Sequence, residues 1–245
     1  MAFFAAVRLR ALVLAVVLLL GAVSMGAWGA RQIFGRHAVP AAVLPAGVTA
    51  RHLVVIDPGH GGPDPGAVGR AGTLEKDVAL AVGLELARYL NRAGIRTILT
   101  RTGDYRLADE AGSLKERQVE DLNRRAQVAE EAGATLLVSI HANSFPSPRW
   151  SGAQTFYQQG ETESRRLAEA IQAQLVRRLP PNRRKARPAD YRILRESEMP
   201  AVIVEVGFLS NPEEEARLRD RAYQGRVAEA IFHGIMDYLS ASAGR

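Results

Sequence analysis

The sequence of 245 residues predicts an α/β fold: a single domain with a mostly parallel central sheet and helices on both faces, preceded by an N-terminal membrane-spanning segment. Three observations predict it. Short apolar runs typical of buried strands alternate with amphipathic helical stretches, an order that favours a parallel sheet covered on both faces. Hydrophobic residues make up 47% and charged residues 24% of the chain, as in folded globular proteins. Twenty consecutive uncharged residues stand ahead of the first strand.

The uncharged run, residues 11–30, is flanked by arginines on both sides. At a helical rise of about 1.5 Å per residue it is long enough to cross a bilayer core of about 30 Å. Residues 1–31 are therefore interpreted as a transmembrane anchor or a signal peptide. Residues 32–51 are interpreted as a linker, and residues 52–241 as the catalytic domain. An extracytoplasmic protein, membrane-anchored or secreted, is the expectation.

The first strand is predicted at residues 53–56, where four apolar residues precede a glycine-rich loop that runs through Gly72. A helix is predicted over residues 74–92, because its apolar residues recur at helical spacing. Gly94 suits the C-terminal cap of this helix. Glu75 lies three residues before an apolar position, so its side chain is expected on the buried face.

The next elements are a strand at residues 96–100, a helix at 114–132 and a strand that begins near residue 135 and ends at His141. They are followed by a strand at residues 154–157 and an amphipathic helix at 162–179. A short strand is predicted at residues 191–194 and a longer one from residue 201 into Glu205. Proline after Asn211 marks a helix start, and a last helix is predicted over residues 222–239.

The formal net charge of +6 raises the question of nucleic acid. Most basic residues, however, lie on predicted helix faces beside acidic ones, and a membrane-targeting segment does not fit a cytosolic nucleic-acid enzyme. The one dense basic cluster spans residues 183–187. It is either a solvated loop or a surface that holds an anionic polymer. Nucleic acid is therefore not expected as a partner.

Chemically active side chains stand where the predicted strands end. His60 and His141 each follow an apolar strand and enter a turn of small residues, and Glu75 begins a helix. Strand C-terminal ends are where an open α/β sheet gathers its functional groups. The chain has no cysteine, so a metal must use histidines and carboxylates. Two imidazoles and a carboxylate form the ligand set of a catalytic zinc site, which keeps a fourth position for water.

Glu205 ends a strand of apolar residues, where an unpaired carboxylate is costly. It is therefore expected to have a partner. An arginine in a structural ion pair is one candidate, with Arg101 at the end of a neighbouring strand. A water at the metal is the other.

Four blocks of the sequence, taken together, resemble the zinc-dependent N-acetylmuramoyl-L-alanine amidases, which cut the peptide from the glycan in bacterial cell walls. The blocks are residues 57–62, Glu75, residues 139–144 and residues 204–208, and the likeness runs from about residue 53 to about residue 239. Within that family, residues 150–157 are most similar to the sporulation and germination amidases that process spore-cortex peptidoglycan.

The resemblance implies that His60, Glu75 and His141 bind Zn²⁺ and that Glu205 is the catalytic base. Zinc then activates a water, and Glu205 takes its proton while the water attacks the amide between N-acetylmuramic acid and L-alanine. The substrate is peptidoglycan, whose stem peptides are anionic. The membrane is contacted through the N-terminal helix, and a regulatory protein partner is left unidentified.

Two alternatives remain open at this point. One is a zinc peptidase or deacetylase that acts on another cell-wall amide, because the metal ligands alone do not choose the substrate. The other is a membrane-tethered, non-catalytic wall-binding protein.

Overall fold

The computed structural model describes residues 52–109, 111–179 and 181–243. In chain order these residues form the following strands and helices: β1 (Leu53–Pro58), α3 (Glu75–Arg92), β2 (Arg96–Leu99), α4 (Leu114–Glu131), β3 (Leu136–Asn143), β4 (Gln154–Tyr157), α5 (Thr162–Arg178), β5 (Arg187–Pro188), α6 (Arg192–Arg195), β6 (Ala201–Phe208), α7 (Pro212–Leu218) and α8 (Arg221–Ala243).

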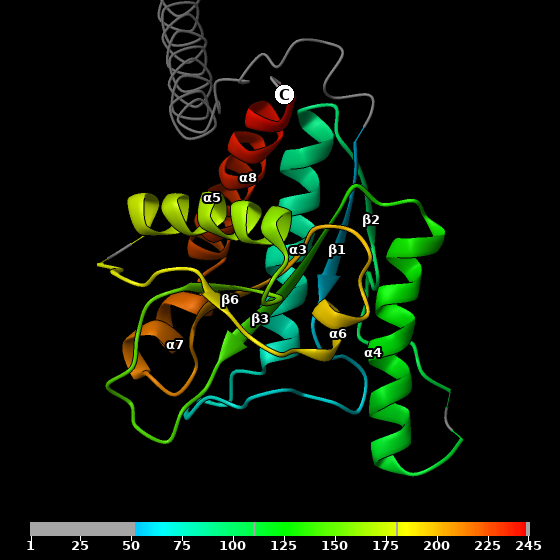
Figure 1. Ribbon diagram of the computed structural model, residues 1–245. Coiled ribbons are helices and arrows are strands. Elements are labelled where there is room, and N and C mark those ends of the chain that lie inside the picture. The colour runs from blue at the N-terminus through cyan, green and yellow to red at the C-terminus, as the bar shows by residue number, and fades with distance from the viewer. Residues whose placement is uncertain (1–51, 110, 180, 244–245) are drawn as a thin grey trace, which may run out of the picture. The chain divides into compact units, whose positions relative to one another are not determined.

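The six strands form one mixed sheet in the order β2-β1-β3-β6-β4-β5. Strands β2, β1, β3 and β6 run parallel to one another, whereas β4 pairs antiparallel with β6 and carries β5 at the edge. The predicted mostly parallel sheet is confirmed. Because β1, β3 and β6 point the same way, their C-terminal ends meet at one edge of the sheet (Figure 1).

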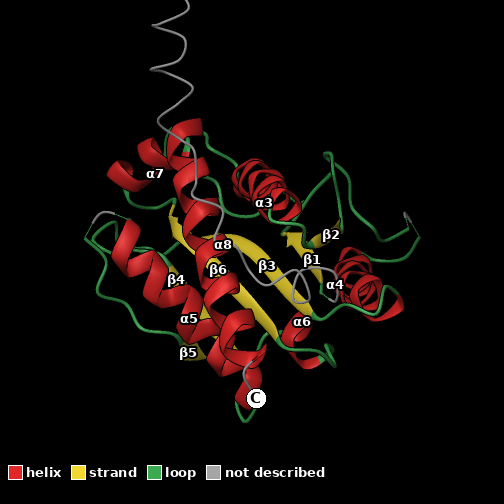
Figure 2. Ribbon diagram, turned by 90° about the horizontal axis from the view of Figure 1, so that it is seen from above, coloured by secondary structure: helices red, strands yellow, loops and turns green. Residues whose placement is uncertain are grey.

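Helices cover both faces of the sheet, as predicted. Helices α3, α5 and α8 pack together on one face, and α4 and α6 lie against the other (Figure 2). The central strands β1, β3 and β6 are buried along almost their whole length, which explains why they are continuous apolar runs rather than alternating ones. The core therefore sits on both sides of the strands whose ends carry the polar side chains.

Local signals fix several helix ends. Ser113 accepts a hydrogen bond from the backbone N–H of Glu116, whose side chain in turn accepts one from the backbone N–H of Ser113, a capping box that starts α4. The Asn211 side chain caps α7, and proline follows it, as the sequence predicts. Gly94 adopts a left-handed backbone (φ 80°) just after α3, in agreement with the predicted cap.

Two short elements differ from the prediction. The prediction of a strand at residues 191–194 is wrong. Most of these residues belong to the single-turn helix α6, whose Ile193 and Leu194 are buried. A run of two apolar residues does not distinguish a strand from a helical turn, and here packing against α4 decides. Strand β5 was not predicted, because two residues that include a proline form a strand only through pairing with β4.

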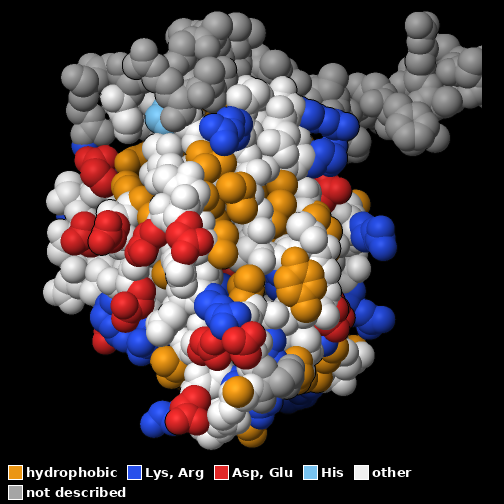
Figure 3. Space-filling view, turned by 90° about the vertical axis from the view of Figure 1, so that its right-hand side faces the viewer, with side chains coloured by type: hydrophobic (Ala, Val, Ile, Leu, Met, Phe, Trp, Pro, Cys, Tyr) orange, Lys and Arg blue, Asp and Glu red, His pale blue; other side chains and the backbone are white. Residues whose placement is uncertain are grey.

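The predicted anchor or signal peptide (residues 1–31) and the predicted linker (residues 32–51) both lie outside the described residues. Among the described helices, none is long and apolar enough to cross a bilayer. On the side of the domain that carries α4 and β2, acidic and basic side chains are interspersed (Figure 3). The positive net charge is therefore not displayed as one basic face there.

Candidate metal centre

Three side chains from distant parts of the chain converge at the C-terminal edge of the sheet. His60 comes from the loop after β1, Glu75 from the first turn of α3, and His141 from the end of β3. Each offers one ligand atom, and these atoms all lie within 4.8 Å of one another. Glu75 Oε1 lies 3.1 Å from His60 Nε2 and 2.9 Å from His141 Nδ1. The structure thus brings together the three residues that the sequence predicts as metal ligands.

Two buried arginines hold the loop that carries His60. Arg101, just after β2, donates to the carbonyl oxygens of Pro58 and Gly59 at 2.9 and 2.8 Å. Arg125, from α4, donates to the carbonyl oxygens of Pro58 and His60 at 2.8 and 2.7 Å. Three consecutive carbonyl groups are therefore fixed from two sides. Sequence reasoning missed this role for both arginines, since backbone acceptors leave no signal in the sequence.

The loop itself is strained at His60. Its φ of 62° is the only left-handed value at a non-glycine residue in the described part of the chain, a conformation that costs energy for a residue with a Cβ atom. Gly59 is required next to it, because a Cβ atom there would lie 2.2 Å from the His141 ring. Likewise, a Cβ atom at Gly66 would lie 2.6 Å from Glu75 Oε2. These two glycines therefore let the backbone of the loop approach the site closely.

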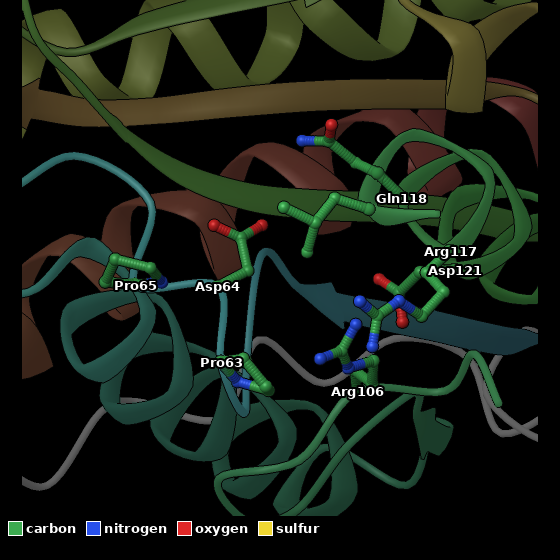
Figure 4. Close-up of a pocket in the computed structure, with 9 residues that line it drawn as sticks. Pro63, Asp64, Pro65, Arg106, Arg117, Gln118 and Asp121 are labelled. Carbon is green, nitrogen blue, oxygen red and sulfur yellow. The ribbon is translucent and has the colours of Figure 1, made fainter. Parts of the chain in front are cut away.

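Asp64 orients His60 from behind. Its Oδ2 atom lies 2.7 Å from His60 Nδ1, which leaves Nε2 directed at Glu75. Burial alone would lower the pKa of His60, but the hydrogen bonds to Asp64 and Glu75 outweigh burial and raise it to about 9. The same negative surroundings attract a metal cation. Asp64 also borders a pocket of about 230 Å³, opposite Arg106, Arg117 and Asp121 (Figure 4).

Glu75 is held by backbone donors as well as by the histidines. Its Oε2 accepts a hydrogen bond from the backbone N–H of Ala67 at 2.8 Å, and its Oε1 accepts one from that of Ala142 at 3.0 Å. Burial works against its charge, but the hydrogen bonds and charges of His141 and His60 prevail and hold the pKa of Glu75 far below its ordinary value. Glu75 is thus a charged, fixed carboxylate at the centre of the site.

The donor set fits a zinc ion. A tetrahedral ion with ligand bonds of about 2.0–2.1 Å separates its ligand atoms by roughly 3.3 Å. The two separations from Glu75 Oε1 to the histidine nitrogens, 3.1 and 2.9 Å, need only a slight expansion to reach that value. Asp64 supplies the carboxylate that a metal-binding imidazole usually has on its other nitrogen.

Glu205 lies beside this cluster as a buried carboxylate. It pairs across the sheet with His141 on β3, so the two residues are neighbours at the same level. Its side chain is 8% exposed, and its Oε2 atom has no hydrogen-bond partner among the described residues. Burial raises the pKa of Glu205 to about 7; the nearby Glu75 carboxylate adds to the rise, while His141 and His60 oppose it.

The candidate ion pair between Arg101 and Glu205 is wrong. All the hydrogen bonds of the Arg101 guanidinium in the described structure go to backbone carbonyl groups. Arg101 was a reasonable candidate because it follows a strand that neighbours β1. However, β2 lies at the far edge of the sheet, with β1 and β3 between it and β6. The sheet order, which the sequence does not reveal, keeps the two residues apart.

A second buried carboxylate, Asp57, was missed by sequence reasoning. It sits at the end of β1 and accepts hydrogen bonds from Arg125 at 2.7 Å and from the hydroxyls of Thr100 and Ser139 at 2.6 Å each. Burial alone would raise its pKa, but Arg125 and the two hydroxyls keep the pKa of Asp57 below its ordinary value. This network joins β1, β3 and α4 directly beneath the metal loop.

Comparisons with known proteins agree with the geometry. Residues 54–237 match the family described as Amidase_3, N-acetylmuramoyl-L-alanine amidase. The germination-specific N-acetylmuramoyl-L-alanine amidase of Bacillus subtilis is 42% identical over 190 residues, which cover 77% of this chain and 80% of that protein.

Solved structures extend the likeness to three dimensions. The CwlD amidase of Clostridioides difficile, solved in complex with the GerS lipoprotein, is 37% identical with a TM-score of 0.75, over 78% of this chain and 99% of that one. The catalytic domain of CwlV, an amidase from Bacillus (Paenibacillus) polymyxa, is 36% identical with a TM-score of 0.66, over 77% of this chain and 98% of that one.

Three findings lead to the same assignment. The family match covers most of the described domain, the relatives are more than one third identical, and the fold is shared. These findings favour this assignment over the two alternatives, a zinc peptidase or deacetylase that acts on another cell-wall amide and a membrane-tethered, non-catalytic wall-binding protein. The chain belongs to the Amidase_3 family and is an N-acetylmuramoyl-L-alanine amidase, a hydrolase that acts on peptidoglycan.

Proposed function

We propose that this amidase depends on zinc, with His60, Glu75 and His141 as the ligands and Glu205 as the general base and acid. The observation that carries the proposal is the placement of a buried carboxylate, one oxygen of which has no hydrogen-bond partner among the described residues, next to three converging ligand atoms. A structural acid in such a position would be paired, as Asp57 is. An unpaired one is suited to receive a proton.

The chemistry divides between the ion and the chain. When bound, zinc supplies Lewis-acid chemistry, which makes a water more acidic and stabilises negative charge on an amide oxygen. Glu205 takes a proton from the attacking water as its oxygen bonds to the carbonyl carbon of the lactyl group. Glu205 then gives that proton to the nitrogen of L-alanine as the C–N bond breaks. The products are a carboxylic acid on the glycan and a free amino group on the stem peptide.

The pKa of Glu205 suits both halves of this cycle. A group whose pKa is near 7 in the protein accepts and returns a proton at neutral pH more readily than an ordinary glutamate. A bound divalent cation would draw that pKa downward, so that Glu205 begins the cycle as a carboxylate.

The biological setting is proposed from the relatives. Similarity to a germination-specific amidase supports action on spore-cortex peptidoglycan, with muramic-lactam formation as the endpoint. The layout of an anchor or signal peptide at residues 1–31, a linker at 32–51 and a catalytic domain at 52–241 supports an extracytoplasmic location. A similar amidase was solved with a lipoprotein, which supports a regulatory protein partner for this chain too.

The experiment is digestion of purified peptidoglycan by the purified full-length protein, with added zinc and in parallel with a chelator. Mass analysis should find stem peptides with free L-alanine amino groups and intact glycan strands, only when zinc is present. The Glu205→Gln protein should bind the same amount of zinc and release stem peptide at least about a hundredfold more slowly. Full activity in chelator, or cleavage within the glycan or the peptide, would contradict the proposal.

A further inference from the structure

A basic groove lies on the β4 side of the metal centre. It has a volume of about 830 Å³ and an aromatic residue, Trp150, in its wall. Its remaining lining is mostly cationic, and the basic side chains come from two separate segments: Arg149, Arg183, Arg184, Lys185 and Arg187. No acidic residue is among the residues that line the groove in the described structure.

The cationic segment of the groove is tied to the body of the domain. The buried Asn182 side chain donates to the carbonyl oxygen of Ala153 and accepts from the backbone N–H of Arg184. Gln154 donates to the carbonyl oxygen of Lys185 and accepts from the Arg184 guanidinium. Residue 187 then pairs with β4 as part of β5. A merely solvated loop would not need these bonds.

Exposure alternates along this segment. Arg183, Lys185 and Arg187 are exposed, whereas Arg184 and Ala186 between them are half-buried. None of the three exposed cations forms an ion pair with an acidic residue in the described part of the chain. The groove is therefore lined by a row of three exposed cations along the sequence.

The groove lies next to the strand that carries the proposed catalytic carboxylate. Gln154, which lines the groove, is the partner of Glu205 in the antiparallel pairing of β4 with β6. Neighbouring strands lie about 4.8 Å apart, and paired residues point to the same face of the sheet. The Gln154 side chain, which accepts a hydrogen bond from Arg184, therefore lies between the row of cations and Glu205.

We propose that this groove binds the carboxylates of the stem peptide, an inference that rests on the proposed function. Glycan strands of N-acetylated sugars are neutral along their length, and the negative charge of peptidoglycan lies on the stem. A substrate placed with its amide at Glu205 has one anionic and one neutral side, and only the anionic side gains from the groove. The groove therefore sets the direction in which the substrate lies.

The test compares two soluble muropeptide substrates, one with free stem carboxylates and one with the same carboxylates converted to amides. Full-length, zinc-loaded protein is assayed as wild type and as a triple variant in which the exposed cations are replaced, Arg183→Gln, Lys185→Gln and Arg187→Gln. We expect the triple variant to raise KM for the free-carboxylate substrate about tenfold, since each exposed ion pair contributes little alone. Its kcat and its KM for the amidated substrate should not change.

The matched control removes the same number and type of charges elsewhere on the described surface, at exposed positions on three helices: Arg92→Gln, Lys115→Gln and Arg177→Gln. It should leave both KM values as in the wild type. An equal rise of KM in both triple variants would assign the effect to net charge and overturn the inference. Unchanged KM values in the groove variant would also overturn the inference. If that variant had instead lost binding to an acidic protein partner, the cations would be assigned to that partner. A wild type that cleaves neither substrate refutes the proposed function itself, which is a separate outcome.

Discussion

Asp57 on β1 and Glu205 on β6 are both buried carboxylates near the C-terminal edge of one sheet, yet their surroundings are opposite. Asp57 has an arginine and two hydroxyls as partners, which hold its pKa below the ordinary value. Glu205 has an oxygen without a partner in the described structure and a pKa raised to about 7. A fully paired carboxylate stabilises the fold, whereas an unpaired one is free to move a proton. Two buried carboxylates near the same metal centre therefore have different roles: Asp57 stabilises the fold, and Glu205 is suited to proton transfer.

The largest effect is expected for turnover of the Glu205→Gln protein. The amide keeps the shape of the side chain but accepts no proton, so kcat should fall by about 10²–10⁴-fold. Zinc content should match the wild type, because Glu205 is not among the proposed ligands. Glu169→Gln, an exposed position on α5, is the control and should keep full activity. If both variants turned over at the wild-type rate, Glu205 would not be the base.

The Asp57→Asn protein should behave in the opposite way, with a loss of stability. Removing one partner of a buried ion pair costs about 3–5 kcal/mol, and the free energy of unfolding should fall by that amount in urea titrations. The matched change at Asp109, which pairs with Arg124 at the surface, should cost less than about 1 kcal/mol. Equal losses at the two positions would mean that burial does not distinguish the pairs.

The pH dependence of stability separates the two carboxylates further. In metal-free protein the folded state holds a proton on Glu205 up to pH about 7, whereas the unfolded chain releases it near 4.5. The folded state binds more protons in this window, so the free energy of unfolding falls as the pH rises through it, by roughly 3 kcal/mol. The Glu205→Gln protein lacks this part of the slope.

This prediction is measured as the difference between wild-type and Glu205→Gln stability in chelator from pH 4 to pH 8. The variant should gain on the wild type as pH rises. Asp57 contributes with the opposite sign, because its pKa is lowered; its stabilisation is complete above its ordinary pKa and is lost as the pH falls below it. A flat difference across the window would show that Glu205 is not a perturbed acid.

A smaller effect is expected at Asp64, the carboxylate behind His60. Replacement by Asn removes the negative acceptor on His60 Nδ1, and loss of such a partner typically weakens metal binding by about 10–100-fold. Zinc affinity is measured by competition with a chelating dye, and Asp190→Asn at the surface should leave it unchanged. Wild-type affinity in the Asp64→Asn protein would show that His60 needs no such support.

The sequence predicted the sheet, its covering helices and the three ligand candidates, because these depend on local patterns: apolar runs, helical spacing and polar residues at strand ends. It failed where the answer depends on the order of strands. Arg101 was one of two candidate partners of Glu205, although two strands separate their positions. The Asp57–Arg125 pair joins residues 68 positions apart, and no local pattern marks such a pair.

The sequence also failed to predict the shortest helix and the shortest strand. Helix α6 and strand β5 are too brief to carry a periodic signal, and their conformations follow from packing and pairing partners. The predicted end of one strand was also too early: β6 continues past Glu205 to Phe208. A polar residue within a strand therefore marked a site correctly, although the strand did not end there.

The central claim is that one divalent ion binds at His60, Glu75 and His141, with Glu205 facing it. An anomalous difference map from crystals of the zinc-loaded protein tests this most directly. The account predicts a single strong peak at about 2.0–2.2 Å from one atom of each of the three ligands, with both Glu205 oxygens beyond bonding distance. A peak elsewhere, or one with Glu205 as a direct ligand in place of any of the three, would contradict it.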